Sequence, residues 1–295
     1  MSLQTHKGPL IKQGWARALI LLIAYVLLTV MAGMLIDKYL VPQKVASGQT
    51  VSPEIVITTS TLFFFTVSFI ISIVTVFVCR KFLDKRSFVS LGLKPKYFFP
   101  GGIIGLLTGL FLVCTGALVI YSLDGLKWVD ISFKAEDFFS SIILLIMVAV
   151  SEELVFRGYI LRNFGKSFNQ WLSLLITSVL FALVHISNPG IPVLGMINIF
   201  LGGLALGLAY MYSRNLWAPI LFHFSWNFFQ GPVLGFPVSG FPFSSILSAE
   251  ETQAYWLNGG DFGFEGSVVC TVLLIVACTI FAWLNIERTP KPAMA

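Results

Sequence analysis

The chain has 295 residues, of which 57% are hydrophobic and only 11% are charged, and its mean hydropathy is +0.87. Soluble domains are roughly 45–50% apolar and about 25% charged, so this composition excludes an ordinary water-soluble protein. The formal net charge is +5. What this charge indicates about binding partners depends on which side of the membrane the charged residues lie. The composition therefore predicts a membrane protein.

Eight apolar segments follow one another along the chain. A helix that crosses a bilayer needs about 20 mostly apolar residues, whereas the strands of a membrane barrel alternate apolar and polar residues over about 10. The segments are solidly apolar, which favours an all-α bundle of about eight transmembrane helices. They cover residues 18–36, 55–79, 98–123, 138–160, 172–187, 191–212, 216–229 and 267–285.

The basic residues indicate how this bundle is oriented. With the N-terminus inside, fourteen of the nineteen Lys and Arg fall on inner segments, four on outer segments, and Arg157 lies within a span. Such an excess is typical of the cytoplasmic side, so we expect both termini in the cytoplasm. The basic excess then faces anionic lipid headgroups and not nucleic acid. We expect a multi-pass protein of the cell membrane, of the bacterial inner-membrane kind.

The first apolar segment follows Lys7, Lys12 and Arg17, in the manner of a secretory signal peptide. It is longer than the apolar region of a typical signal peptide, and no clear small-residue cleavage site follows it. We expect it to be a retained anchor. Four cysteines lie in apolar stretches without the spacing of a metal site, namely Cys79, Cys114, Cys270 and Cys278.

A few ionisable and amide side chains lie inside the apolar segments. They are Glu152, Glu153, Arg157, His185, His223 and Asn227. Such groups are costly in a bilayer, and they commonly face a wet cavity that serves a function. Glu153 and Arg157 are four residues apart and can pair on one helical face. The same spacing lets His223 and Asn227 point into one cavity, and Phe181 stands one turn before His185 and could pack beneath it.

These residue types suit hydrolysis by activated water. Glu152 lies about 100° around the helix from Glu153, so one carboxylate can be structural and the other chemical. A buried carboxylate beside a histidine suits a general base, which here would be Glu152 with His185. Hydrolysis of a carbonyl group also needs donors for the oxyanion, which His223 and Asn227 could supply. No serine or cysteine nucleophile is required.

Three motifs in this region resemble those of the CPBP intramembrane proteases, the group that contains the type 2 CAAX prenyl proteases. The sequence EELVFRG at residues 152–158 resembles the EExxxR motif, FALVH at 181–185 resembles FxxxH, and HFSWN at 223–227 resembles HxxxN. The stretch LWAPIL at 216–221 is similar to the usual lead into the third motif. The resemblance covers roughly residues 88–230, and no motif position departs from the pattern.

The resemblance implies a multi-helix membrane fold and a glutamate-dependent endopeptidase. It places water activation on Glu152 and His185, and oxyanion stabilisation on His223 and Asn227, in agreement with the geometric assignment. Arg157 would be structural and would pair with Glu153. We expect one membrane domain over residues 1–295, with a protease core at 88–230. A peptide, or a prenylated protein tail, would be cut at the membrane.

A metal ion is the main open question about the chemistry. Glu152, His185 and His223 offer carboxylate and imidazole ligands that zinc accepts, yet no HExxH motif is present. We expect a site without a metal cofactor and keep zinc as the alternative. Two other functions stay open, namely an ion- or proton-coupled transporter and an idle membrane scaffold that regulates a partner. The oligomeric state and the substrate stay open as well.

Three further local features of the structure are predicted from the sequence. The glycine-rich stretch 201–207 predicts close helix packing. The loop at 231–266, rich in Gly, Pro and aromatic residues, could form a partial lid. His223 falls near the inner end of its segment, whereas His185 falls nearer the outer end of its own. Either segment 172–187 begins deeper in the bundle, or the helix around Gly158 breaks and re-enters the membrane.

Overall fold

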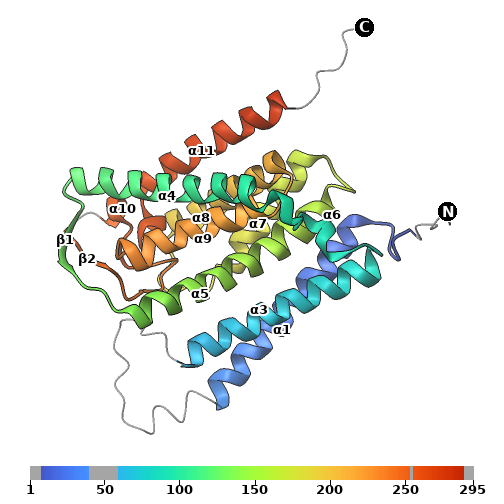
Figure 1. Ribbon diagram of the computed structural model, residues 1–295, viewed down its shortest axis with the longest axis horizontal. Coiled ribbons are helices and arrows are strands. Elements are labelled where there is room, and N and C mark those ends of the chain that lie inside the picture. Colours follow the sequence, from blue (N-terminus) through green and yellow to red (C-terminus); the bar gives the residue numbers. More distant parts are fainter. Residues whose placement is uncertain (1–7, 40–58, 253–254, 289–295) are drawn as a thin grey trace.

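The computed structural model describes residues 8–39, 59–252 and 255–288, and in this part of the chain it is mostly helical (Figure 1). Six of the described helical stretches are long and apolar enough to cross a membrane, and the chain is a multi-pass membrane protein. These stretches are Gly14–Ile36, Leu62–Leu83, Phe88–Ser122, Ala135–Phe164, Val193–Ser213 and Val268–Glu287.

A helix is present at each of the eight apolar segments of the sequence. In chain order the α-helices are α1 (Gly14–Tyr39), α3 (Thr59–Val78), α4 (Phe98–Ser122), α5 (Ala135–Glu153), α6 (Arg162–Phe164), α7 (Gln170–Val184), α8 (Val193–Ser213), α9 (Trp217–Phe228), α10 (Tyr255–Asn258) and α11 (Val268–Glu287). Shorter 3-10 helices connect them at η2 (Phe88–Leu91), η3 (Pro95–Tyr97), η6 (Gly260–Phe262) and η7 (Phe264–Gly266). Three π-helices extend α-helices at η1 (Cys79–Leu83), η4 (Leu154–Leu161) and η5 (Phe229–Val233).

The predicted count of about eight spans is not confirmed. Helix α7 has 15 residues, and α9 with its extension η5 runs from Trp217 to Val233; neither is among the described stretches that are long and apolar enough to cross a bilayer. After α7 the chain turns at residues 185–192 and returns as α8, so these two helices form a hairpin. Apolar content alone cannot distinguish a helix surrounded by lipid from a short helix surrounded by protein.

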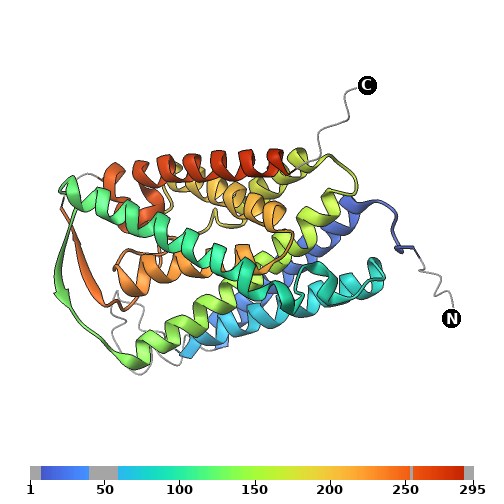
Figure 2. The same ribbon diagram turned by 45° about the horizontal axis from the view of Figure 1, so that its top comes forward.

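A two-stranded antiparallel ribbon is the part of the fold that the all-α expectation missed. Strand β1 (Leu126–Ile131) pairs with β2 (Leu247–Glu251), with a bulge between Trp128 and Asp130. The ribbon joins the loop after α4 to the long loop before α11, and it lies at one end of the molecule (Figure 2). The start of α1, the end of α3 and helix α6 lie towards the opposite end.

Helix α4 packs directly against α9 through glycines. A Cβ atom at Gly105 would lie 2.0 Å from the carbonyl oxygen of Ala218, and one at Gly109 would lie 2.6 Å from that of Phe222. The hydroxyl of Ser225 on α9 donates to the carbonyl of Leu106 on α4 at 2.7 Å. These close contacts fix the position of α9, which carries the third motif.

The glycine-rich stretch of α8 packs as expected at two positions. A Cβ at Gly203 would lie 3.2 Å from Ser178 on α7, and one at Gly207 would lie 2.3 Å from the side chain of Leu174. At Gly202 no atom lies within 4 Å of the added Cβ, so the close-packing expectation is wrong there. The first two glycines bring α7 and α8 together.

Candidate active site

The first motif lies where α5 continues into the π-helix η4. Glu152 and Glu153 form the end of α5, and all eight residues of η4 are buried. The stretch does not break at Gly158, so that sequence alternative is wrong. π-Helical segments inserted into α-helices are frequent at functional sites. This segment places Glu152 and Arg157 within one packed core.

Glu153 and Arg157 form a buried ion pair. Nη1 of Arg157 lies 2.7 Å from Oε1 of Glu153, and both side chains are almost fully buried. Nη2 of Arg157 donates to the carbonyl of Gly203 at 2.9 Å, and the guanidinium lies 4.4 Å from the centre of the Phe181 ring. The pair therefore ties the first motif to α7 and α8.

His223 on α9 lies between the two glutamates. Its Nδ1 is 3.0 Å from Oε1 of Glu153, the same oxygen that Arg157 contacts. Its Nε2 is 4.0 Å from Oε2 of Glu152. Because Nδ1 faces a carboxylate oxygen, the proton on this nitrogen is donated to Glu153, and Nε2 is the nitrogen that faces Glu152.

His185 comes directly after α7 and is oriented by Phe181. Its Nδ1 lies 2.7 Å from the carbonyl oxygen of Phe181, and the two rings are 4.7 Å apart between their centres. A carbonyl oxygen only accepts, so Nδ1 carries the proton and Nε2 has the lone pair. That Nε2 lies 3.7 Å from Oε2 of Glu152.

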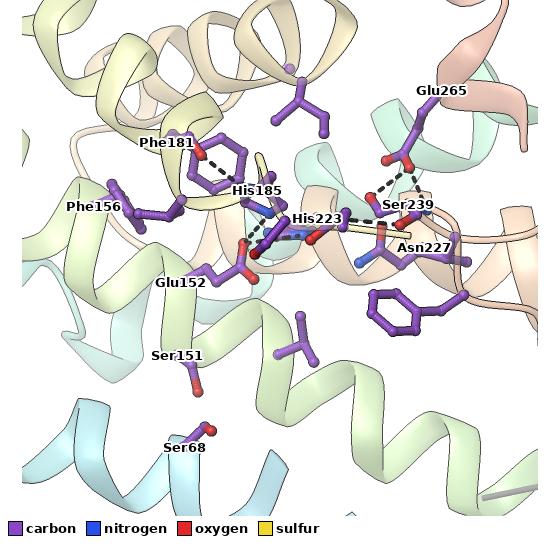
Figure 3. A pocket seen from close by; sticks show the side chains of 18 of the residues that line it. Ser68, Ser151, Glu152, Phe156, Phe181, His185, His223, Asn227, Ser239 and Glu265 are labelled. Atoms are coloured by element: carbon purple, nitrogen blue, oxygen red, sulfur yellow. Dashed lines mark hydrogen bonds and ion pairs between the residues drawn. The ribbon is translucent and has the colours of Figure 1, made fainter. Parts of the chain in front are cut away.

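Oε2 of Glu152 is thus the point on which both imidazoles converge (Figure 3). It is buried and accepts no hydrogen bond from the described residues. Its separations from the two Nε2 atoms exceed a hydrogen bond but lie within the reach of one bridging water molecule. The three side chains come from α5, the end of α7, and α9.

A cavity of about 770 Å³ contains this convergence point. Asn227 lines it one turn after His223, and α1, α3 and α5 supply a largely apolar wall that includes Val26, Phe65 and Leu145. All four predicted catalytic residues, Glu152, His185, His223 and Asn227, line this one cavity. The sequence analysis did not foresee the contribution of α1 and α3, because neither helix carries a polar motif.

The long loop before α11 closes another side of the cavity. Ser239 donates to Oε2 of Glu265 through its backbone N–H and its hydroxyl, each at 2.7 Å, and Asn188 donates to the carbonyl of Ser239 at 3.3 Å. Figure 3 shows Ser239 and Glu265 on the side of Asn227, away from Glu152. All three residues line the cavity, and the motifs gave no signal for them. The expected partial lid thus corresponds to a loop held by Glu265.

The start of α9 packs against the segment that precedes α4. Leu216 is fully buried, and its N–H donates to the carbonyl of Gly92 at 3.1 Å. Asn215 is buried as well. The first residues of α9 are thus held by protein, and His185 and His223 reach the same cavity although they lie near different ends of their segments.

No group of three or more His, Cys, Asp or Glu side chains in the described part of the chain is arranged to hold a metal ion. Glu152, His185 and His223, the residues named for zinc, do not form such a group as they stand. The expectation of a metal-free site stays a prediction.

A comparison with protein families bears on the segment that contains the three motifs. Residues 134–229 match a family described as type II CAAX prenyl endopeptidase Rce1-like. The segment is Rce1-like. This match confirms the resemblance drawn from the motifs and supports a protease of the CAAX type at the family level. It covers the later part of the predicted core at 88–230.

One curated protein is similar to part of this chain. It is an uncharacterized 24.3 kDa protein of Escherichia coli, 34% identical over 82 residues, which are 27% of this chain and 37% of the relative. The chain thus spans well under half the length of that relative, whose name states no activity. The match over residues 134–229 is therefore the comparison that bears on function.

Proposed function

We propose that this protein is an intramembrane endopeptidase in which Glu152 activates water. The observation that carries the proposal is the position of Oε2 of Glu152, which faces Nε2 of His185 at 3.7 Å and Nε2 of His223 at 4.0 Å inside a cavity of about 770 Å³. The Rce1-like match supports the same class of reaction. No other described cavity of the protein combines a carboxylate with two imidazoles.

Water would be activated between Glu152 and His185. A water molecule that donates to Oε2 of Glu152 and to Nε2 of His185 has both protons directed at bases, which raises the nucleophilicity of its oxygen. Glu152 takes a proton as the water oxygen bonds to the carbonyl carbon of the peptide. The same proton is later delivered to the leaving amide nitrogen as the C–N bond breaks, so Glu152 returns to its carboxylate form.

His223 and Asn227 would stabilise the oxyanion of the tetrahedral intermediate. The amide of Asn227 supplies one N–H donor. Because Nδ1 of His223 donates to Glu153, its Nε2 can donate only when the ring is protonated, and the carboxylates at 3.0 and 4.0 Å balance the charge of that ring. Fixed donors directed at developing negative charge commonly contribute the largest share of catalysis.

The cavity suits an apolar peptide or a lipidated peptide tail. Its wall on α1, α3 and α5 is apolar, whereas Asn188, Ser239 and Glu265 provide polar groups on the side of Asn227. A substrate would place its apolar part between α1 and α5 and its scissile amide between Glu152 and Asn227. Membrane proteases of this kind would act on peptides or protein tails at the bilayer.

Comparative peptidomics tests the proposal directly. Membranes that contain the wild-type chain are compared with membranes that contain Glu152→Gln, which keeps the shape of the side chain and removes the base. We expect cleaved peptides that are present with wild type and absent with the variant at equal expression. Identical peptide profiles would contradict the proposal.

A separate experiment tests whether the peptidase activity requires a metal ion. The purified wild-type protein is treated with a chelator, its metal content is measured by mass spectrometry, and its peptidase activity is then assayed. We expect activity to persist with less than a tenth of an equivalent of zinc. Loss of activity that zinc restores would assign Glu152, His185 and His223 to a metal site and would overturn the metal-free mechanism.

A further inference from the structure

A group of cations surrounds one buried acid at the end of the molecule away from the β ribbon. The carboxylate of Asp84 is almost fully buried, it contacts Nη1 of Arg17 at 2.6 Å, and it pairs with Arg80. Nζ of Lys166 lies 4.0 Å from it. The negative charge of Asp84 is therefore already balanced inside the protein.

A second cavity, of about 520 Å³, lies beside this network. Its lining residues are Lys81, Lys85, Arg86, Ser87 and Ser90, and we call it the basic pocket. Its three cationic side chains form no ion pair with any residue that the structure describes. The pocket thus combines uncompensated positive charge with the hydroxyl of Ser87, which is the chemistry that binds phosphate. The hydroxyl of Ser90 is already engaged by Arg80 and by the carbonyl of Ser87.

The wall of the basic pocket is fixed from within the protein. Arg80, fully buried, donates to the hydroxyl of Ser90 through Nη2 at 2.6 Å and through Nε at 3.2 Å. The backbone of Lys85 has a φ of 54°, a left-handed conformation that lysine rarely adopts. Such backbone conformations persist where the surrounding structure imposes them, and they cluster at ligand-binding sites.

The surroundings of Lys166 show that positive charge is in excess here. Burial, together with the nearby Arg17, Arg80 and Arg162, lowers the pKa of Lys166 to about 8, although Asp84 acts in the opposite direction. One carboxylate does not offset this number of cations. An additional anion would be stabilised at this end of the protein.

The basic pocket also borders the surface that faces hydrocarbon. Phe77, Val78 and Phe82 are exposed, and Nζ of Lys81 lies 5.4 Å from the centre of the Phe77 ring and 5.5 Å from that of Phe82. An anion that fits both surfaces has a charged head and an apolar tail. Clusters of Lys and Arg directly after a transmembrane helix bind anionic lipid headgroups in this way.

We propose that the basic pocket binds the phosphate headgroup of an anionic phospholipid, with the acyl chains lying on Phe77, Val78 and Phe82. This inference does not depend on the proposed peptidase activity. The headgroup would take the place of a second acid beside Lys85, Arg86 and Ser87. It would link the end of α3 to η2 through one ligand.

Native mass spectrometry of the full chain, released from mixed micelles, tests the proposal. The probes are phosphatidic acid and phosphatidylcholine with the same acyl chains. The test variant is Lys85→Gln/Arg86→Gln, and the matched control is Lys94→Gln/Lys96→Gln, which removes two exposed charges from the neighbouring loop outside the pocket. Thermal unfolding of both variants confirms that each is folded.

We expect the wild type to retain phosphatidic acid in preference to phosphatidylcholine. At about 1 kcal/mol for each basic residue near an anionic lipid, the test variant should bind phosphatidic acid about thirtyfold more weakly, and the control should bind within about threefold of wild type. Equal losses in the two variants would indicate diffuse surface attraction and would overturn the site. The absence of any preference for phosphatidic acid would overturn it as well.

A competition experiment separates the two sources of phosphate. Inorganic pyrophosphate is added at increasing concentration to the wild-type chain loaded with phosphatidic acid. We expect the lipid to stay bound, because its acyl chains contribute to binding. Displacement of the lipid at a pyrophosphate concentration equal to that of the lipid would assign the pocket to a soluble phosphate and would overturn the lipid assignment.

Discussion

Two adjacent glutamates have opposite environments in this protein. Oε1 of Glu153 contacts both Arg157 and His223, whereas Oε2 of Glu152 faces the cavity without a hydrogen-bond partner among the described residues. A carboxylate that compensates a buried cation is needed for stability, and one that faces a cavity is available for chemistry. The adjacent positions therefore predict different consequences for the same substitution.

The substitution Glu153→Gln should destabilise the fold, because it leaves the buried guanidinium of Arg157 without its counter-charge. Loss of one partner of a buried ion pair costs about 3–5 kcal/mol. Glu152→Gln should change the free energy of unfolding by less than about 1 kcal/mol, because this side chain is partly exposed and lies 3.7 Å or more from either imidazole. Thermal unfolding of both variants in one detergent measures the difference. Equal stability of the two variants would contradict the division of roles.

Asn227→Ala should lower kcat about 10²–10³-fold, as the loss of one oxyanion donor does in other hydrolases, with little change in KM. Asn258→Ala is the control, because Asn258 is buried, donates to the carbonyl of Gly125 and does not line the cavity. We expect Asn258→Ala to lower the melting temperature and to leave kcat of the folded fraction close to wild type. An unchanged kcat for Asn227→Ala, measured by steady-state cleavage of a peptide, would refute the oxyanion role.

The sequence was sufficient to name the four motif residues that line the cavity, but not how their side chains are oriented. Helical spacing predicted that Glu153 and Arg157 pair and that Phe181 lies beneath His185, and both contacts are present. The contact between His223 and Glu153 joins residues 70 positions apart, so no local spacing could indicate it. Glu265 was missed for the same reason, because it lies in a loop with no periodic pattern.

At the scale of elements, helix positions were predictable and helix depths were not. The apolar segments gave the location of every long helix, since hydrocarbon and protein interior both favour apolar residues. They could not show that α7 ends at His185 within the bundle, or that α9 begins at a buried Leu216. Depth depends on the neighbours of a helix, and these are set by contacts distant in the sequence.

Gly105→Ala should disturb the contact between α4 and α9, because the new methyl group would lie 2.0 Å from the carbonyl oxygen of Ala218. Overpacking of this kind costs about 1–3 kcal/mol, and it should also displace His223 and lower peptidase activity. Gly165→Ala is the matched control, because the atom nearest to its added methyl group, the carbonyl oxygen of Leu161, lies at an ordinary contact distance of 3.4 Å and Gly165 does not line the cavity. Melting temperature and activity are measured for both. A Gly105→Ala protein as stable and active as the control would contradict the packing argument.

At the scale of the whole molecule, the structure has two dissimilar ends. The β1–β2 ribbon lies at one end, and the start of α1 and the end of α3 lie at the other (Figure 2). The cation-rich network around Asp84 joins these two helix ends. The positive-inside pattern of the sequence predicts that the cation-rich end faces the cytoplasm. The sequence suggests this polarity, but it does not predict the ribbon. The alternation of apolar and polar residues in β1 and β2 is too short to be recognised as a strand pattern.

Cysteine labelling of intact cells tests this orientation. In a background without the four native cysteines, Lys127→Cys on β1 should react with a membrane-impermeant maleimide, and Lys94→Cys should react only after the cells are opened. Both lysines are exposed, so accessibility to the reagent depends on the side of the membrane. The reverse pattern would show that the chain is inserted the other way.

One oxygen of Glu153 contacts both Arg157 and His223. These contacts predict which residues would be retained in descendants of this chain that have lost catalytic activity. Selection for a correctly assembled bundle would still preserve Glu153, Arg157 and His223, because their mutual contacts hold three helices together. Glu152 and Asn227 would drift first, since neither makes a contact on which assembly depends. An inactive descendant would thus be recognised by an incomplete first motif beside an intact arginine.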